Sequence, residues 1–180
     1  MRMAGRFGRV ACGGTFDMLH KGHRTFIRRA FEVGERVVIG LTTDGFVKKL
    51  GKPHPVAPYE ERMKELTEFL RREGLLDRAE IVPLSNPHGP AAWNGTVDAL
   101  VVSRETEPRA REINRLRVEA GLQPLEVVVV DMVLAEDGLP ISTTRIRAGE
   151  IDREGHLLIH PTTKLKEGET KKHEFTGKEI

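Results

Sequence analysis

Five short apolar runs rich in β-branched residues, separated by amphipathic stretches, limit most strongly which folds are open to this chain. The stretches between the first three runs and the stretch before the last run carry apolar residues at helical spacing, and each ends at glycine. Strands that alternate with helices pair in parallel, because each helix returns the chain to the same end of the sheet. The pattern predicts an α/β fold with an open, mostly parallel five-stranded sheet and helices on both faces. The strands are expected within residues 6–14, 35–44, 79–84, 97–103 and 124–131, and the helices within 22–34, 58–74 and 105–121.

Composition narrows the class of protein further. Hydrophobic residues make up 38% of the 180 positions, and no apolar run approaches the ~20 residues that span a bilayer. The basic N-terminus lacks an apolar segment, so we expect no signal peptide and no membrane association. Cys12 is the single cysteine, which excludes an internal disulfide and favours a reducing compartment, the cytoplasm. We expect Cys12 to be a small buried residue.

Charge and aromatic content argue against nucleic-acid binding. The chain has 29 basic and 27 acidic residues and only 5% aromatic residues, so it lacks a basic footprint and stacking platforms. The alternating pattern ends near residue 152, and residues 161–180 mix Lys and Glu with few apolar positions. We therefore predict one domain over 1–152 and a C-terminal extension over 153–180, flexible in its last 20 residues.

The motif GGTFDMLHKGH, residues 13–23, follows the first predicted strand and opens the first predicted helix. The free N–H groups at a helix start attract anions, so His20 and His23 could both face a bound phosphate. The same two histidines could instead cap the helix, lie in solvent, or ligate a metal with Asp17 as a third ligand. The motif differs from a Walker P-loop, and it lacks the third glycine of a dinucleotide fingerprint.

A second motif, ISTTRIRAGEID, covers residues 141–152. Ser142, Thr143 and Thr144 offer hydroxyl groups, and Arg145 offers a forked cation, all of which suit phosphate oxygens. Read alone, the motif is as consistent with a helix N-cap as with a phosphate site. Because it accompanies the histidine motif in one parallel sheet, phosphate binding is the favoured interpretation.

The chain resembles a known family. GGTFDMLHKGH is similar to the HxGH signature of the nucleotidyltransferase superfamily, whose fold is Rossmann-like. With TTDGFVKK, PYEER, VVSRETEPR and ISTTRIRAGEID in the same order, residues of about 8 to 152 resemble the archaeal and eukaryotic type of phosphopantetheine adenylyltransferase. The resemblance implies transfer of AMP from ATP to 4′-phosphopantetheine, giving dephospho-CoA and pyrophosphate, with Mg²⁺ bound with ATP. It also implies that the chain binds dephospho-CoA or CoA.

The resemblance also implies roles for individual residues. One of Lys48, Lys49 and Lys52 would contact the acceptor phosphate, with Lys49 and Lys52 favoured. Bacterial members carry threonine where His20 stands and a pair of arginines after the fourth strand, where this chain has Arg104. The implied catalytic residues are His20, His23 and Lys49; the nucleotide-binding residues are Gly14, Thr15, Phe16, His23, Ser142, Thr143, Thr144 and Arg145; the acceptor-binding residues are Thr15, Lys49, Lys52 and Arg104; no protein ligand to a metal is implied.

Other functions on the same fold stay open at the level of the sequence. Relatives in the superfamily transfer adenylyl or cytidylyl groups to FMN, nicotinamide mononucleotide or glycerol phosphate, and the two motifs do not separate these acceptors. A non-catalytic nucleotide sensor is a second possibility, although it would not require both histidines and the Ser-Thr-Thr-Arg segment. The sequence is compatible with a monomer or a homo-oligomer.

Overall fold

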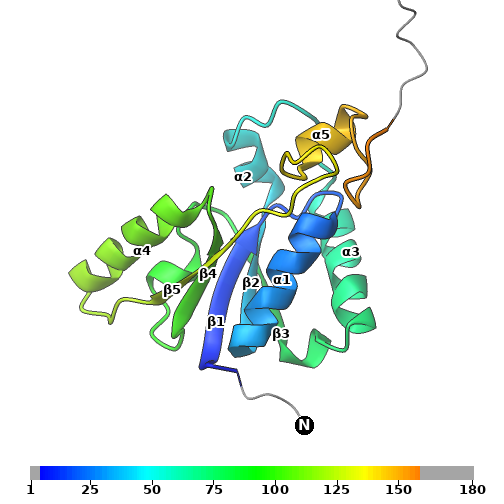
Figure 1. Cartoon of the computed structure of the whole chain (residues 1–180). Coiled ribbons are helices and arrows are strands. Elements are labelled where there is room, and N and C mark those ends of the chain that lie inside the picture. The colour runs from blue at the N-terminus through cyan, green and yellow to red at the C-terminus, as the bar shows by residue number, and fades with distance from the viewer. Residues whose placement is uncertain (1–4, 159–180) are drawn as a thin grey trace, which may run out of the picture.

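The structure is a computed structural model of the chain and describes residues 5–158. Its centre is a five-stranded sheet in the order β3-β2-β1-β4-β5, in which every neighbouring pair is parallel (Figure 1). The predicted sheet and the three predicted helices are confirmed, whereas the short helix α2 was not predicted. The strands are β1 (Phe7–Gly14), β2 (Gly34–Thr42), β3 (Ala79–Leu84), β4 (Ala99–Ser103) and β5 (Glu126–Val130); the helices are α1 (Lys21–Val33), α2 (Asp44–Lys49), α3 (Tyr59–Arg72), α4 (Glu107–Glu119) and α5 (Thr143–Arg147), with 3₁₀ turns at Leu76–Arg78 and Pro90–Ala92.

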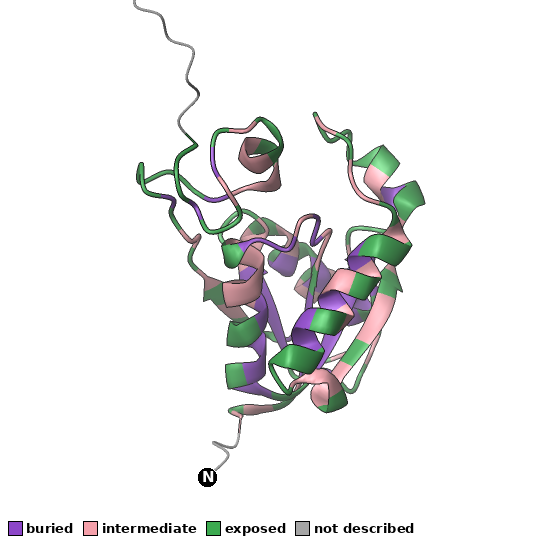
Figure 2. Cartoon of the chain, turned by 90° about the vertical axis from the view of Figure 1, so that its right-hand side faces the viewer, coloured by how far each residue is buried: buried purple, intermediate pink, exposed green. Residues whose placement is uncertain are grey.

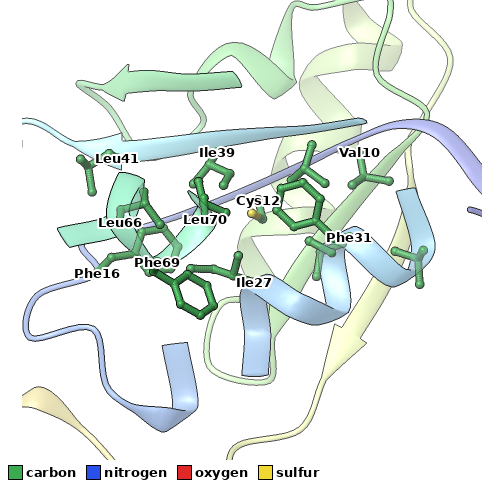
Figure 3. Packing of buried hydrophobic residues seen from close by; sticks show 14 of the residues in the cluster. Val10, Cys12, Phe16, Ile27, Phe31, Ile39, Leu41, Leu66, Phe69 and Leu70 are labelled. Atoms are coloured by element: carbon green, nitrogen blue, oxygen red, sulfur yellow. The ribbon is translucent and has the colours of Figure 1, made fainter. Parts of the chain in front are cut away.

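One face of the sheet is covered by α1 and α3, and this side holds the larger hydrophobic core (Figure 3). Ile27 and Phe31 of α1 lie four residues apart and therefore on one side of the helix, where they pack with Leu66 of α3. Cys12 of β1 lies within this core, and burial raises the pKa of its thiol to about 12. Cys12 is thus an inert core residue, as expected from the sequence.

The opposite face is covered by α4 and the Pro90–Ala92 turn, so helices lie on both faces of the sheet (Figure 1). Ala110 and Ile113 of α4 pack with Leu100 of β4 and Val38 of β2 in a second core. Figure 2 shows that the buried residues gather on the sheet and on the helix sides that face it. No helix within residues 5–158 is both long and apolar enough to cross a membrane.

The order of the strands places a binding crevice at one edge of the sheet. β1 lies at the centre with β2 on one side and β4 on the other, so the chain leaves β1 and β4 in opposite directions. In open parallel sheets, ligands bind outside the carboxyl ends of the strands at such a switch point. Both sequence motifs lie at this edge, because one follows β1 directly and the other follows β5.

After β5 the chain folds back over this edge and forms a small cluster of Ala135, Ile141 and Ile151. This segment is joined to the start of α1, because the Lys21 N–H donates to the Arg153 carbonyl at 2.8 Å. Packed structure continues past residue 152 as far as the bridge between Ile151 and Leu157. The segment predicted to be flexible, residues 161–180, lies outside the described residues.

Candidate active site

Two cavities meet at the carboxyl edge of the sheet. The loop-side cavity is enclosed by residues 13–17, His20, His23, residues 130–133 and residues 141–144. The sheet-side cavity, of about 390 Å³, lies between α4, the loop after β3 and the loop that follows α2. Six residues line both cavities and so form their junction: Gly13, Gly14, Thr15, Lys52, Glu105 and Thr106.

The loop between β1 and α1, residues 15–20, has an unusual backbone. Phe16 and Met18 have positive φ angles of 48° and 57°, a region that costs a residue with a side chain of the order of 1–3 kcal/mol. Neighbouring side chains hold this shape: Arg62 donates to the Thr15 carbonyl at 3.0 Å, and Arg24 donates to the Leu19 carbonyl at 3.0 Å. The loop is therefore held from outside rather than by its own backbone.

Two glycines of the motif make room for the rings beside them. A Cβ on Gly14 would lie 3.0 Å from the ring of Phe16, and a Cβ on Gly22 would lie 3.0 Å from the ring of His20. Such distances are tighter than ordinary van der Waals contact, so each ring would have to shift by a few tenths of an ångström to admit a Cβ. The space above Gly14, which the resemblance implies to be nucleotide-binding, is thus occupied in part by Phe16.

The two histidines stack on one another beside the loop. Their ring centroids are 3.6 Å apart with an angle of 19° between the planes, and Phe16 meets His23 edge-on at 5.4 Å. His20 is the N-cap of α1, since its Nδ1 accepts a hydrogen bond from the His23 N–H at 3.3 Å. The neutral ring then carries its proton on Nε2, which makes that atom a donor. His20 therefore caps the helix and lines the cavity at the same time.

Burial changes how these histidines can bind an anion. Burial, with smaller contributions from Arg24 and Arg153, lowers the pKa of His20 to about 4, against an opposing effect of Asp17. Burial also lowers the pKa of His23 well below its usual value, with His20 and Lys52 adding to the effect. Both rings are neutral at pH 7 and act as hydrogen-bond donors. Within the described part of the chain, the buried His23 Nδ1 has no hydrogen-bond partner, so a ligand could satisfy it.

These pKa values predict how stability depends on pH. The unfolded His20 takes up a proton near pH 6.5 and the folded one only near pH 4, so protons favour the unfolded state between those values. We expect stability to be constant above pH 6.5 and to fall by ~2–3 kcal/mol as the pH approaches 4. Thermal unfolding between pH 7.5 and 4 measures this. His20→Asn keeps an N-cap acceptor but cannot titrate, so its stability should fall less; an equal fall would contradict the assignment.

The second motif forms α5 and the residue before it. Ser142 is the N-cap, and its Oγ accepts from the Arg145 N–H at 3.3 Å. Thr143 Oγ1 donates to the Asp17 carbonyl at 2.9 Å, across 126 positions of sequence. Ser142, Thr143 and Thr144 line the loop-side cavity. The structure therefore brings this segment together with the histidines. Ser142, which caps α5, also forms part of the cavity wall.

Two arginines of the second motif point in different directions. The guanidinium of Arg145 pairs with Asp137 and Glu150, and Arg145 does not line either cavity. Arg147 instead reaches Asp17, with its Nε 3.0 Å from Oδ2 and its Nη2 3.0 Å from Oδ1. The structure therefore does not bring Arg145, predicted to bind the nucleotide, together with the other predicted residues.

Asp17 is occupied by protein partners rather than free to bind a metal. Its side chain is 3% exposed, and Oδ1 also accepts the Ala57 N–H at 3.1 Å. No group of three or more His, Cys, Asp or Glu side chains within residues 5–158 could hold a metal ion. Asp17 thus acts as a tether between segments.

The predicted cations differ in their position. Lys52 belongs to the junction of the two cavities, whereas Lys49, at the end of α2, is exposed and lines neither of them. Arg104 is also exposed and lines neither cavity, although it pairs at 2.7 Å with Asp131, which lines the loop-side cavity. Arg109, in the first turn of α4, lines the sheet-side cavity instead. The structure brings Lys52 to the site and leaves Lys49 and Arg104 outside it.

Arg62 is a site residue that sequence reasoning missed. It is fully buried in α3 and donates to the carbonyls of Thr15 and Ala57, at 3.0 Å and 2.8 Å, and to Thr42 Oγ1 at 3.2 Å. It also pairs with Asp44 at 3.0 Å. The available signal was its position four residues before Leu66, which places a charged residue on the buried side of the helix.

Comparisons with other proteins agree with this geometry. The model of the cytidylyltransferase-like family matches residues 11–149. The chain is 46% identical over 156 residues to the phosphopantetheine adenylyltransferase of Methanothermobacter thermautotrophicus, covering 87% of this chain and 93% of that protein. It is 50% identical over 147 residues to the phosphopantetheine adenylyltransferase of Methanopyrus kandleri, covering 82% of this chain and 92% of that protein.

Solved structures share the fold. A protein of unknown function from Archaeoglobus fulgidus superposes with a TM-score of 0.61 at 35% identity, covering 68% of this chain and 89% of that one. A lipopolysaccharide core biosynthesis protein from Thermoplasma volcanium, at 20% identity and a TM-score of 0.56, supports the fold alone; it covers 68% of this chain and 95% of its own. The stacked histidines, the α5 segment beside them and the two archaeal relatives lead to one conclusion: the chain belongs to the phosphopantetheine adenylyltransferases of the cytidylyltransferase-like family.

Proposed function

We propose that this protein transfers the AMP group of ATP to 4′-phosphopantetheine and releases dephospho-CoA and pyrophosphate. The observation that carries the proposal is the meeting of two cavities at Thr15 and Lys52: the first is lined by His20, His23 and residues 142–144, and the second has an aliphatic floor. Relatives that share 46% and 50% of their residues with this chain are named for the same reaction. The cytoplasm, expected from the single cysteine, is part of this proposal.

In this proposal, the loop-side cavity holds ATP. The first N–H groups of α1 carry partial positive charge and attract phosphate oxygens, and the Nε2–H of His20 adds a neutral donor. His23 stacks against His20, so the two rings form one rigid wall. Across the cavity, the hydroxyls of Ser142 and Thr144 and the backbone of this segment offer donors to the outer phosphates, whereas the Thr143 hydroxyl donates to the Asp17 carbonyl.

The reaction needs no covalent enzyme intermediate, because the acceptor phosphate is itself the nucleophile. An oxygen of that phosphate attacks the α-phosphorus of ATP, and the bond from the α-phosphorus to the bridging oxygen breaks as pyrophosphate leaves. Catalysis then consists of aligning the two anions and stabilising the charge on the α-phosphate and the leaving group. His20 and His23 would stabilise the α-phosphate, and Lys52 at the junction would offset the repulsion between the substrates.

Mg²⁺ would enter with ATP. This ion keeps several waters and is usually held by substrate phosphates together with one or two carboxylates. Glu105 at the junction is a carboxylate that could contact its hydration shell, whereas Asp131 is paired with Arg104 and Asp17 with Arg147. When bound, the ion would neutralise charge on the triphosphate.

The sheet-side cavity fits a long, flexible acceptor. Its floor is aliphatic, with Val38 of β2 and Leu100 of β4, and Ile113 of α4 forms part of the wall. One aromatic residue, Phe46, lines it among the described residues, so the cavity offers little stacking surface for a flat ring such as that of FMN. Glycerol phosphate would leave most of the 390 Å³ unfilled. A chain of methyl, methylene and amide groups complements this lining better.

An acceptor panel tests the proposal. The protein is incubated with ATP or CTP and with 4′-phosphopantetheine, FMN, nicotinamide mononucleotide or glycerol phosphate, and pyrophosphate and product mass are measured. We expect turnover with ATP and 4′-phosphopantetheine to exceed every other pair by at least roughly 10²-fold, because the mismatched acceptors lose the contacts of the sheet-side cavity. Faster adenylylation of FMN would overturn the proposal, and no turnover with any acceptor would favour a nucleotide sensor.

A further inference from the structure

Asp17 is the point at which the two halves of the loop-side cavity are joined. Three hydrogen bonds connect residues 15–20 with residues 142–147 in the described structure, and all three end on Asp17. Two come from Arg147 to the carboxylate, and one comes from the Thr143 hydroxyl to the carbonyl. The Ala57 N–H adds a fourth contact from the segment that follows Lys52.

The carboxylate of Asp17 is not placed to bind phosphate. A buried negative charge beside a polyanion site is unfavourable unless a cation offsets it, and Arg147 supplies that cation through two hydrogen bonds. The donors from Arg147 and Ala57 occupy both carboxylate oxygens. The role left to Asp17 is therefore to hold segments in place.

The neighbouring backbone shows why such a tether is needed. Asp17 lies between Phe16 and Met18, both with positive φ, so the loop has no preference of its own for this shape. α5 is only five residues long and packs on the small cluster around Ile141. Neither segment has enough local structure to fix its distance from the other.

We propose that the Asp17–Arg147 pair is a positioning pair that fixes the spacing between the two halves of the triphosphate site. This inference rests on the proposed function in that ATP is the ligand of the loop-side cavity. A ligand that spans two half-sites gains affinity because its second half binds at high effective concentration, and that gain depends on the spacing. Loss of the pair should therefore weaken the binding of ATP more than the binding of AMP or pyrophosphate, because each of these smaller ligands occupies only one half of the triphosphate site.

The test compares the affinities of ATP, AMP and pyrophosphate by calorimetry in Asp17→Asn, Arg147→Lys and the parent protein. Asp17→Asn keeps the acceptor for the Ala57 N–H but loses the charge, and Arg147→Lys keeps the charge but loses the forked contact. We expect ATP affinity to fall by roughly tenfold or more in Asp17→Asn, with AMP and pyrophosphate changing by less than about threefold. Arg147→Lys should show the same pattern with a smaller fall.

Glu73→Gln is the matched control, because Arg28 contacts Glu73 through two bonds of 2.9 Å on the far side of α1. It should leave all three affinities unchanged. An equal loss of affinity for the three ligands, or no loss of affinity for ATP, would overturn the inference. If Asp17→Asn does not fold, the affinities of Arg147→Lys decide between these outcomes. A parent protein that binds ATP but adenylylates another acceptor would refute the proposed function while leaving this inference intact.

Discussion

Replacing His23 with alanine is expected to lower kcat by about 10²–10³-fold while the fold stays intact. The ring of His23 lines the loop-side cavity, and its stacking on His20 fixes the orientation of the second ring. The capping bond to His20 uses the backbone N–H of residue 23, so the substitution leaves that bond in place. The loss should therefore fall on the stabilisation of the α-phosphate rather than on α1.

Steady-state rates at saturating ATP and 4′-phosphopantetheine, with circular dichroism of the same samples, measure this effect. His156→Ala is the control, because His156 has a 61% exposed side chain that pairs with Asp152 away from both cavities. Its rate should stay within about twofold of the parent protein, as for surface substitutions in general. Near-normal turnover in His23→Ala would remove His23 from the catalytic residues.

Replacing Arg62 with alanine is expected to destabilise the protein by about 3–5 kcal/mol, the range seen when one member of a buried charged network is removed. The substitution leaves the carbonyls of Thr15 and Ala57 and the hydroxyl of Thr42 without their donor. It also opens a cavity in the core under α3, where Arg62 is fully buried. Each buried group left without a partner adds about 1–3 kcal/mol.

Denaturant unfolding at pH 7 measures this prediction, and the melting temperature should fall by roughly 10 °C for a chain of this size. Arg115→Ala is the control, because Arg115 forms an exposed pair with Glu119 one turn along α4. Its stability should change by less than ~0.5 kcal/mol. A loss below about 1 kcal/mol in Arg62→Ala would show that Thr15 and Ala57 do not depend on Arg62.

The strands could be predicted because their pattern depends on residues that are neighbours in the sequence. Runs such as 124–131 are β-branched, and α1 repeats its apolar residues every three or four positions, so each element reveals its own type. The short helix α2 escaped prediction because six residues provide little periodicity. Its start is fixed by a local cap, in which Thr43 Oγ1 accepts the Phe46 N–H at 3.2 Å.

The alternation of strands and helices along the chain, the two motifs and the resemblance to one family all follow from the sequence, because motifs and periodicity are local properties. Which charges reach the site is different. Lys52 and Lys49 are three residues apart, yet only Lys52 lies at the junction; Arg147 and Arg145 are two apart, yet only Arg147 reaches Asp17. Such choices depend on contacts between segments far apart in the sequence, as with Arg147 and Asp17, which are 130 positions apart, and these contacts exist only once the tertiary structure has formed.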